Sequence, residues 1–214
     1  SPARLGLTSI TRPHRRPWAK LSPPPNAYAV DLGTSTIASE LGRAGYRSTL
    51  IGKWHLGYGN NPFDLDKVVM PPGFGPPTPA IWFGFEKPPS ANFATQGETV
   101  RSFALEHGGK NTGPLTEQAI RFLESTDHDP TPFLLFVSFP APHIPMEAAP
   151  GLVSKYEKKF AGRNISIDSR YAAMVEALDL ACGMITSWLQ VHGRLEDTWV
   201  FFFSDNGGLH RVYH

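Results

Sequence analysis

The stretch that decides the fold is Gly45-Tyr-Arg-Ser-Thr-Leu-Ile-Gly-Lys-Trp-His-Leu-Gly57. Its short apolar run, Ser48 to Ile51, stops at a glycine and is followed by Lys53 and His55. Buried strands of open parallel sheets bring charged residues to the rim in this way, and ligands bind there. An ammonium group close to an imidazole suits an oxyanion, because one group is permanently charged and the other exchanges a proton near neutral pH.

Two other interpretations of this stretch compete with an oxyanion site. A nucleotide-binding P-loop is a poor match, because Gly45 and Gly52 are too far apart and Trp54 stands where a Ser or Thr should follow the lysine. The simpler alternative is a surface lysine and a packed histidine after an ordinary strand.

Composition limits the class of protein. The 214 residues suffice for one large domain, predicted to occupy 1–214, and the net charge of +1 gives no reason to expect a nucleic-acid partner. We expect no membrane span in this segment, since no apolar run is long enough. The chain begins at Ser1 without a Met, and we expect it to be part of a longer polypeptide. Cys182 is the only cysteine, and its small neighbours indicate a packed apolar residue.

Helical and strand patterns alternate along the chain. Helices are predicted from Thr36, as N-cap, to the turn before Gly45, over 116–125 with Thr116 as N-cap, and over 168–192. Strands are predicted at 47–51, 133–139 and 199–203, and residues 58–113 read as a long Pro- and Gly-rich loop, packed at a substrate mouth or on the surface. The apolar strands do not alternate, as expected when helices cover both faces of a parallel sheet. The predicted fold class is therefore α/β, with a mostly parallel sheet flanked by helices.

Polar residues follow each predicted strand. Lys53 and His55 follow the first, His143 lies between prolines after the second, and Asp205 and Asn206 follow the third. If the strands are parallel neighbours, these residues meet at one edge of the sheet. The carboxylate and amide oxygens of the third group suit Ca²⁺ or Mg²⁺, although Asp-Asn-Gly-Gly is explained equally well by a tight turn.

Four stretches together resemble the sulfatase family. They are Gly52–Gly57, Phe136–Pro145, Tyr171–Asp179 and Phe203–Gly208. They are similar to the arylsulfatase-type catalytic domain of the alkaline-phosphatase-like superfamily, of which this chain would be an incomplete, central portion. The resemblance implies hydrolysis of a sulfate monoester of a small molecule or carbohydrate.

The resemblance also implies roles for the residues after the strands. Asp205 and Asn206 would bind Ca²⁺, with Mg²⁺ as the alternative. Lys53 and His143 would contact the sulfate oxygens, and His55 would hydrogen-bond to the nucleophile. A periplasmic or secreted location is likewise implied by the family alone.

The family's nucleophile is a formylglycine, made from the first residue of Cys/Ser-x-Pro-x-Arg, and no complete copy of that motif stands in this chain. Ser1-Pro-Ala-Arg4 either is the tail of that motif or lies just downstream of it, so the role of Arg4 stays open. The modified residue is expected upstream of Ser1, and this chain alone is expected to be inactive. Two alternative functions remain: a phosphate or phosphonate monoester hydrolase of the same superfamily, and a non-catalytic binder of sulfated glycans.

Overall fold

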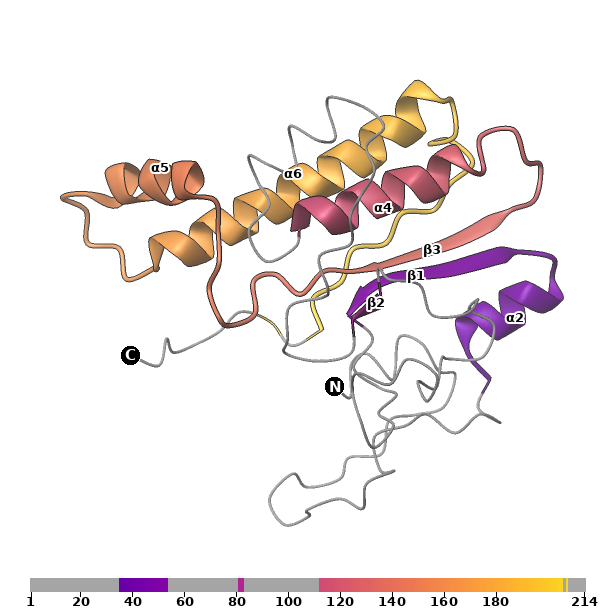
Figure 1. The fold of residues 1–214 in the computed structure, drawn as a ribbon, viewed down its shortest axis with the longest axis horizontal. Helices are drawn as coiled ribbons and strands as arrows, with labels where there is room; N and C mark the ends of the chain where they lie inside the picture. Colours follow the sequence, from indigo (N-terminus) through magenta and orange to yellow (C-terminus); the bar gives the residue numbers. More distant parts are fainter. Residues whose placement is uncertain (1–34, 54–80, 83–111, 206, 208–214) are drawn as a thin grey trace, which may run out of the picture. The chain divides into compact units, whose positions relative to one another are not determined.

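The computed structural model describes residues 35–53, 81–82, 112–205 and 207. In chain order the elements are α2 (Ile37–Arg43), β1 (Arg47–Lys53), β2 (Ile81–Trp82), α4 (Thr112–Glu124), β3 (Phe133–Ser138), α5 (Pro150–Phe160) and α6 (Ser169–Val191) (Figure 1). The chain divides into two compact units. The first contains α2, the three strands and residues 203–205; the second contains α4, α5, α6 and the segments around them.

The first unit is built on a parallel sheet with the strand order β2-β1-β3. β1 and β3 pair in register from Arg47 opposite Phe133 to Gly52 opposite Ser138, and they lie side by side in Figure 1. On its other side β1 pairs in parallel with β2 at its last two residues. Leu50 and Ile51 of this central strand are buried, as expected for an apolar strand with neighbours on both sides. The predicted α/β class with parallel pairing is confirmed.

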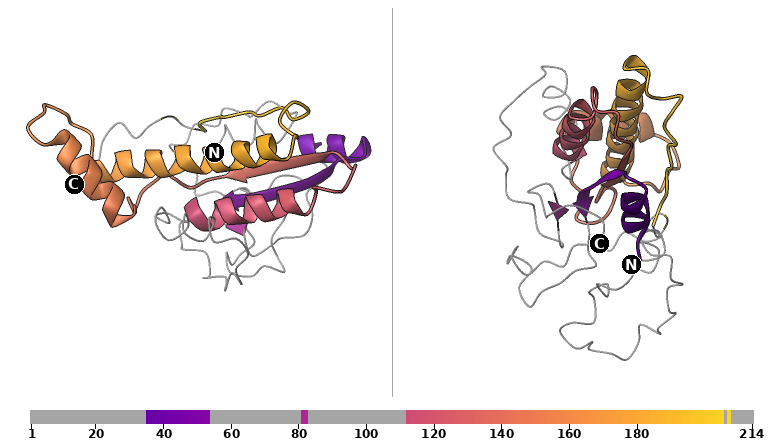
Figure 2. Two further views of the ribbon diagram at one scale, coloured as in Figure 1. Left: turned by 90° about the horizontal axis from the view of Figure 1, so that it is seen from above. Right: turned by 90° about the vertical axis from the view of Figure 1, so that its right-hand side faces the viewer.

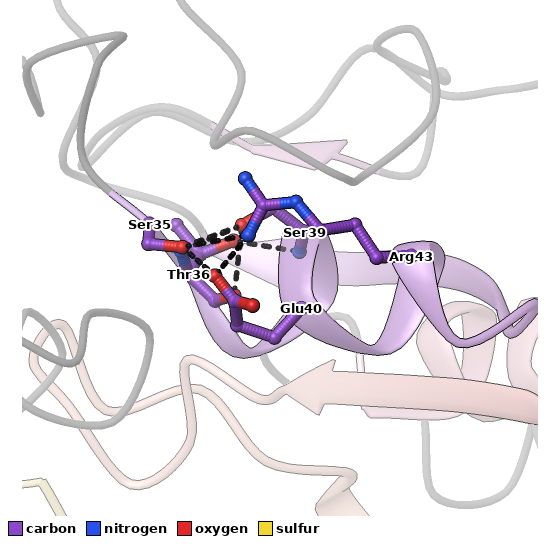
Figure 3. Close-up of polar contacts among 5 residues, drawn as sticks. All are labelled: Ser35, Thr36, Ser39, Glu40 and Arg43. Carbon is purple, nitrogen blue, oxygen red and sulfur yellow. Dashed lines mark hydrogen bonds and ion pairs between the residues drawn. The ribbon is translucent and has the colours of Figure 1, made fainter.

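Helix α2 precedes β1 and contacts it. Thr36 is its N-cap, as predicted: the Thr36 side chain accepts from the Ser39 backbone N–H at 3.1 Å. The Thr36 N–H in turn donates to Ser39 Oγ at 2.8 Å, which completes a capping box (Figure 3). Ser35, Glu40 and Arg43 extend this polar cluster along the exposed side of the helix.

The second unit is helical. α4 and α6 pack against each other and lie side by side in both views (Figures 1 and 2). Their contact is apolar, with Leu115, Ala119 and Leu123 of α4 and Ala173, Met174, Ala177 and Ala181 of α6 buried. This spacing of three and four residues places the buried side chains on one stripe of each helix.

The predicted start of α4 was wrong. The helix begins at Thr112, and Thr116 lies inside it, with its hydroxyl donating to the Thr112 carbonyl at 2.7 Å. A threonine hydroxyl can either cap a helix or bond back to the preceding turn, and residue type alone does not distinguish the two. Pro114 falls in the first turn, where its missing N–H removes no helical hydrogen bond.

Helix α6 agrees with the predicted 168–192 span. Asp168 caps it by accepting from the Arg170 backbone N–H at 2.7 Å, and Gly193 follows with a φ of 65°. Of the described helices, α6 alone is long and apolar enough to cross a membrane by length and composition. It also carries Glu176 and Asp179 and packs against α4 and α5. We therefore interpret it as a packed helix of this unit.

Two further differences concern α5 and the third strand. α5 was not predicted. Its first residue is a proline and its last turn holds Lys158 and Lys159, which are both helix signals, but it lacks a side-chain cap and contains no fully buried residue. Residues 199–203 were predicted to be a strand, and the described chain pairs no strand there. All five side chains are exposed, with Trp199 88% exposed. An apolar sequence favours burial, but residues form a β-strand only when their backbone hydrogen-bonds to a neighbouring strand.

Candidate functional site

Lys53 is the last residue of β1, the central strand, and only 5% of it is exposed. Gly52, directly before it, has a φ of 99°, a conformation that residues with a Cβ rarely adopt. The strand therefore ends with a backbone turn that only glycine tolerates well, followed by a buried ammonium group. Lysine is almost never this buried unless its charge is compensated, and Lys53 does interact with other groups of the protein. The strand end therefore holds a buried cation at the edge of the sheet, where open parallel sheets bind their ligands.

The end of β3 lies at the same edge of the sheet as Lys53. The parallel register puts Ser138 opposite Gly52, and Ser138 is buried although its side chain is polar. Ser138 falls inside the strand predicted at 133–139 and is not one of the predicted site residues. The available signal was a single hydroxyl at the end of an otherwise apolar run. Its position makes Ser138 a neighbour of the candidate anion site in the first unit.

His143 belongs to the second unit, in the segment that follows β3 in sequence. It is exposed, and its backbone N–H donates to the Pro140 carbonyl at 2.9 Å. Its Nδ1 lies 2.6 Å from the Ile144 carbonyl oxygen. Since a carbonyl only accepts, Nδ1 carries the proton in this contact, and Nε2 is the ring atom that can exchange a proton with a substrate.

Asp205 belongs to the first unit, as Lys53 does, and is partly exposed in a bend. Gly207 nearby has a φ of 75°, so the backbone turns sharply here. Within the ranges that the structure describes, no three His, Cys, Asp or Glu side chains form a group that could hold a metal ion. A carboxylate next to an amide is the right donor chemistry for Ca²⁺ or Mg²⁺. This stretch fits as a contributor of two ligands, and further ligands would have to come from elsewhere in the protein.

Two predicted site residues, His55 and Asn206, lie outside the described residues. Of the three strand ends predicted to converge, the pairing of β1 with β3 confirms that two share an edge. The third has no strand behind it, so Asp205 follows an extended, exposed segment. The structure thus supports the placement of Lys53 at the sheet edge, while the complete convergence stays a prediction.

Cys182 does not take part in the candidate site. Burial, and then the nearby Asp179 carboxylate, raise the pKa of its thiol. A raised pKa lowers the fraction of reactive thiolate, which is the reverse of what a catalytic cysteine needs. Its partial burial in α6 agrees with the packing role that the sequence predicts.

Comparison with known proteins finds relatives by sequence and similar structures by fold. A chain segment of 194 residues is 26% identical to mouse arylsulfatase J, and 177 residues are 31% identical to mouse N-acetylgalactosamine-6-sulfatase. These matches cover 86% and 78% of this chain, which spans only 31% and 32% of the two relatives.

Among solved structures, the fold is similar to that of Ps i-CgsB in complex with k-i-k-neocarrahexaose, with a TM-score of 0.58 and 21% identity. That match covers 90% of this chain and 45% of the other, and it shows a shared alkaline-phosphatase-like α/β fold, incomplete here. The sequence model of the family described as Sulfatase matches residues 6–213. Because this match covers nearly the whole sequence, the chain belongs to the sulfatase family.

Proposed function

We propose that the protein containing this chain hydrolyses a sulfate monoester. The observation that carries the proposal is the buried Lys53 at the carboxyl end of the central parallel strand, within a chain that belongs to the sulfatase family. Sulfate ester cleavage needs compensation of the charge on the sulfate oxygens. A fixed cation held in a water-poor position supplies more stabilisation than it would in bulk solvent.

Lys53 is proposed to bind one sulfate oxygen. Lys53 ends a paired strand, so its backbone is held in place, and its burial excludes water. The ammonium group therefore needs little reorganisation when substrate binds.

His143 is proposed to protonate the leaving oxygen. Its Nδ1 contact with the Ile144 carbonyl orients the ring, and protonation at Nε2 then gives an imidazolium that can donate to the ester oxygen. A well-placed imidazole typically contributes about 10²–10⁴-fold to the rate. His55 is proposed to hydrogen-bond to the nucleophile and hold it for attack.

A metal ion and a nucleophile complete the proposal. Asp205 and Asn206 would hold a Ca²⁺ ion, or Mg²⁺, which when bound supplies positive charge next to the sulfate oxygens. A formylglycine elsewhere in the full-length protein would supply the attacking hydroxyl in its hydrated form. The residues of this chain bind the sulfate, orient it and deliver the proton.

The substrate is proposed to be a carbohydrate sulfate. The relative named N-acetylgalactosamine-6-sulfatase and the fold neighbour solved with k-i-k-neocarrahexaose both support this class. The particular ester stays open, and so does a small-molecule sulfate. A periplasmic or secreted location stays a prediction.

The test uses the full-length protein with an aryl sulfate and, in parallel, the matching aryl phosphate. We expect sulfate to be the better substrate and Lys53→Ala and His143→Ala each to reduce kcat at least about 100-fold. His128→Ala is the matched control, because His128 is exposed in a described loop and lies outside the proposed site. Turnover by either site variant at the wild-type rate would contradict these roles. Faster phosphate than sulfate hydrolysis would favour the phosphatase alternative, and tight sulfate-ester binding without turnover would favour the non-catalytic binder.

A further inference from the structure

The carboxyl end of α5 and the turn after it carry an unusual balance of charge. Residues 155–170 contain five cations, and two of them are neutralised within the unit: Lys155 by Glu176 at 2.6 Å and Arg170 by Asp168 at 2.8 Å. The other three, Lys158, Lys159 and Arg163, are exposed and form no ion pair with any residue of the described ranges. We call these three residues the α5 basic surface.

Helix geometry brings the three cations to one end. Lys158 and Lys159 stand in the last turn of α5, and Gly162, with a φ of 70°, ends the helix. The Arg163 backbone N–H then donates to the Phe160 carbonyl at 3.0 Å, which turns the chain back next to that last turn. Glu157 is the nearest acid in sequence, but residues one or two positions apart on a helix do not face each other.

The α5 basic surface rests on a fixed helix. The Lys155–Glu176 ion pair ties α5 to α6, and the Glu176 hydrogen bond raises the pKa of Lys155. Burial raises the pKa of Tyr156, and its hydrogen bond to Glu176 raises it further. The ammonium group of Lys159 lies 5.4 Å from the centre of the Tyr156 ring, close enough for a cation–π contact.

The interaction of the cations with the helix itself explains only part of this pattern. The negative end of the helix dipole favours cations in the last turn, which accounts for Lys158 and Lys159. Arg163 lies beyond the last helical residue, where the effect of the dipole is weaker. Three cations that pair with no carboxylate among the described residues, on a fixed support, are suited to a partner with several regularly spaced negative charges.

We infer that Lys158, Lys159 and Arg163 form a docking surface for a sulfated polysaccharide chain, which they bind through its sulfate groups. The charge complementarity comes from the structure, and the choice of a sulfated polymer rests on the proposed function. The surface would hold a stretch of the polymer without taking part in hydrolysis. Short sulfate esters are therefore not expected to use it.

The test compares two double variants of the full-length protein, each of which lowers the net charge by two. Lys158→Gln/Arg163→Gln removes cations of the α5 basic surface, whereas Arg43→Gln/Arg170→Gln removes exposed cations that already pair with Glu40 and Asp168. Binding to immobilised chondroitin 6-sulfate is measured between about 50 and 300 mM NaCl. Loss of two ionic contacts should lower the slope of log affinity against log salt by about 1.5 and weaken binding about tenfold at low salt, with little change in the control.

Aryl sulfate turnover is measured on the same variants and should stay at the wild-type rate. Equal weakening by both double variants would overturn the inference, and so would single-stranded DNA binding as tightly as the sulfated polymer. If the protein fails to cleave aryl sulfate while the polymer result is as expected, the proposed function fails and the docking surface stands. Normal aryl sulfate turnover with unchanged polymer binding would refute the docking surface alone.

Discussion

Thr36 specifies where the polypeptide enters helix α2. Its hydroxyl satisfies the Ser39 backbone N–H, and the Ser39 hydroxyl satisfies the Thr36 N–H in return. We expect Thr36→Ala to lower the free energy of unfolding by about 1 kcal/mol, because a buried donor loses its partner. Thr36→Ser keeps the oxygen and should cost less. Urea unfolding of the full-length protein measures both, and equal losses for Ala and Ser would show that methyl packing, not capping, dominates at this fully buried position.

The thiol of Cys182 offers a second test at the level of one side chain. Because burial and Asp179 raise its pKa, less thiolate is present at any given pH than in a free cysteine. Iodoacetamide should label Cys182 at pH 8 at least about tenfold more slowly in the native protein than in urea, as followed by mass spectrometry of its peptide. Asp179→Asn removes the second cause and should speed native labelling slightly. Native labelling as fast as in urea would contradict the assigned environment.

At the level of the secondary-structure element, the carboxylate of Asp168 at the start of α6 makes the stability of the fold depend on pH. The Arg170 side chain lowers the pKa of Asp168 below its ordinary value of 3.8, and the Arg170 backbone N–H acts in the same direction. A carboxyl group with a lowered folded-state pKa stabilises the fold above the unfolded value and loses that effect as the pH falls through the folded value. The stabilisation is therefore complete at pH 7, and it is lost progressively as the pH falls from about 3.8 through the lower, folded-state pKa.

Asp168→Asn isolates this charge, since asparagine is also a good N-cap. The pair is partly exposed, so we expect a loss of only about 0.5 kcal/mol at pH 7, shrinking towards zero near pH 3. Arg170→Gln should show the same pH dependence, because it removes the other half of the pair. A loss that persists unchanged at pH 3 would mean that shape, and not charge, is responsible.

Elements with several agreeing local signals could be predicted from the sequence. Helices α2 and α6 each have a capping side chain, an apolar stripe and a glycine after the last turn, and both were placed within a residue or two. Helix α5 lacks a side-chain cap and a fully buried residue, and its signals are limited to a proline at the start and two lysines in the last turn, so it was not predicted; in the structure it contacts α6. The segment at 199–203 shows the opposite case, since a strongly apolar pattern forms no strand without a paired neighbour.

For the molecule as a whole, the candidate site was partly predictable. The position of Lys53 at the end of a strand followed from local sequence, because a short apolar run stops at a glycine directly before it, and the β1–β3 pairing confirmed that the ends of these two strands share an edge. The burial of Ser138 was not predictable, since it depends on register with Gly52 across strands distant in sequence. Roles for His55 and Asn206 came only from resemblance to the family, and they stay predictions.

The 214-residue chain produced by itself should be inactive and prone to association. It spans about a third of its curated relatives, and Trp199, Phe201 and Phe202 are largely exposed in it. Exposed apolar clusters of this kind bind apolar dyes and promote association. We expect this chain to bind such a dye, to bind less after Trp199→Ser/Phe202→Ser, and to cleave no aryl sulfate above background. Turnover that disappears in Lys53→Ala would contradict this expectation, because it would mean that these residues form a working site without the rest of the protein.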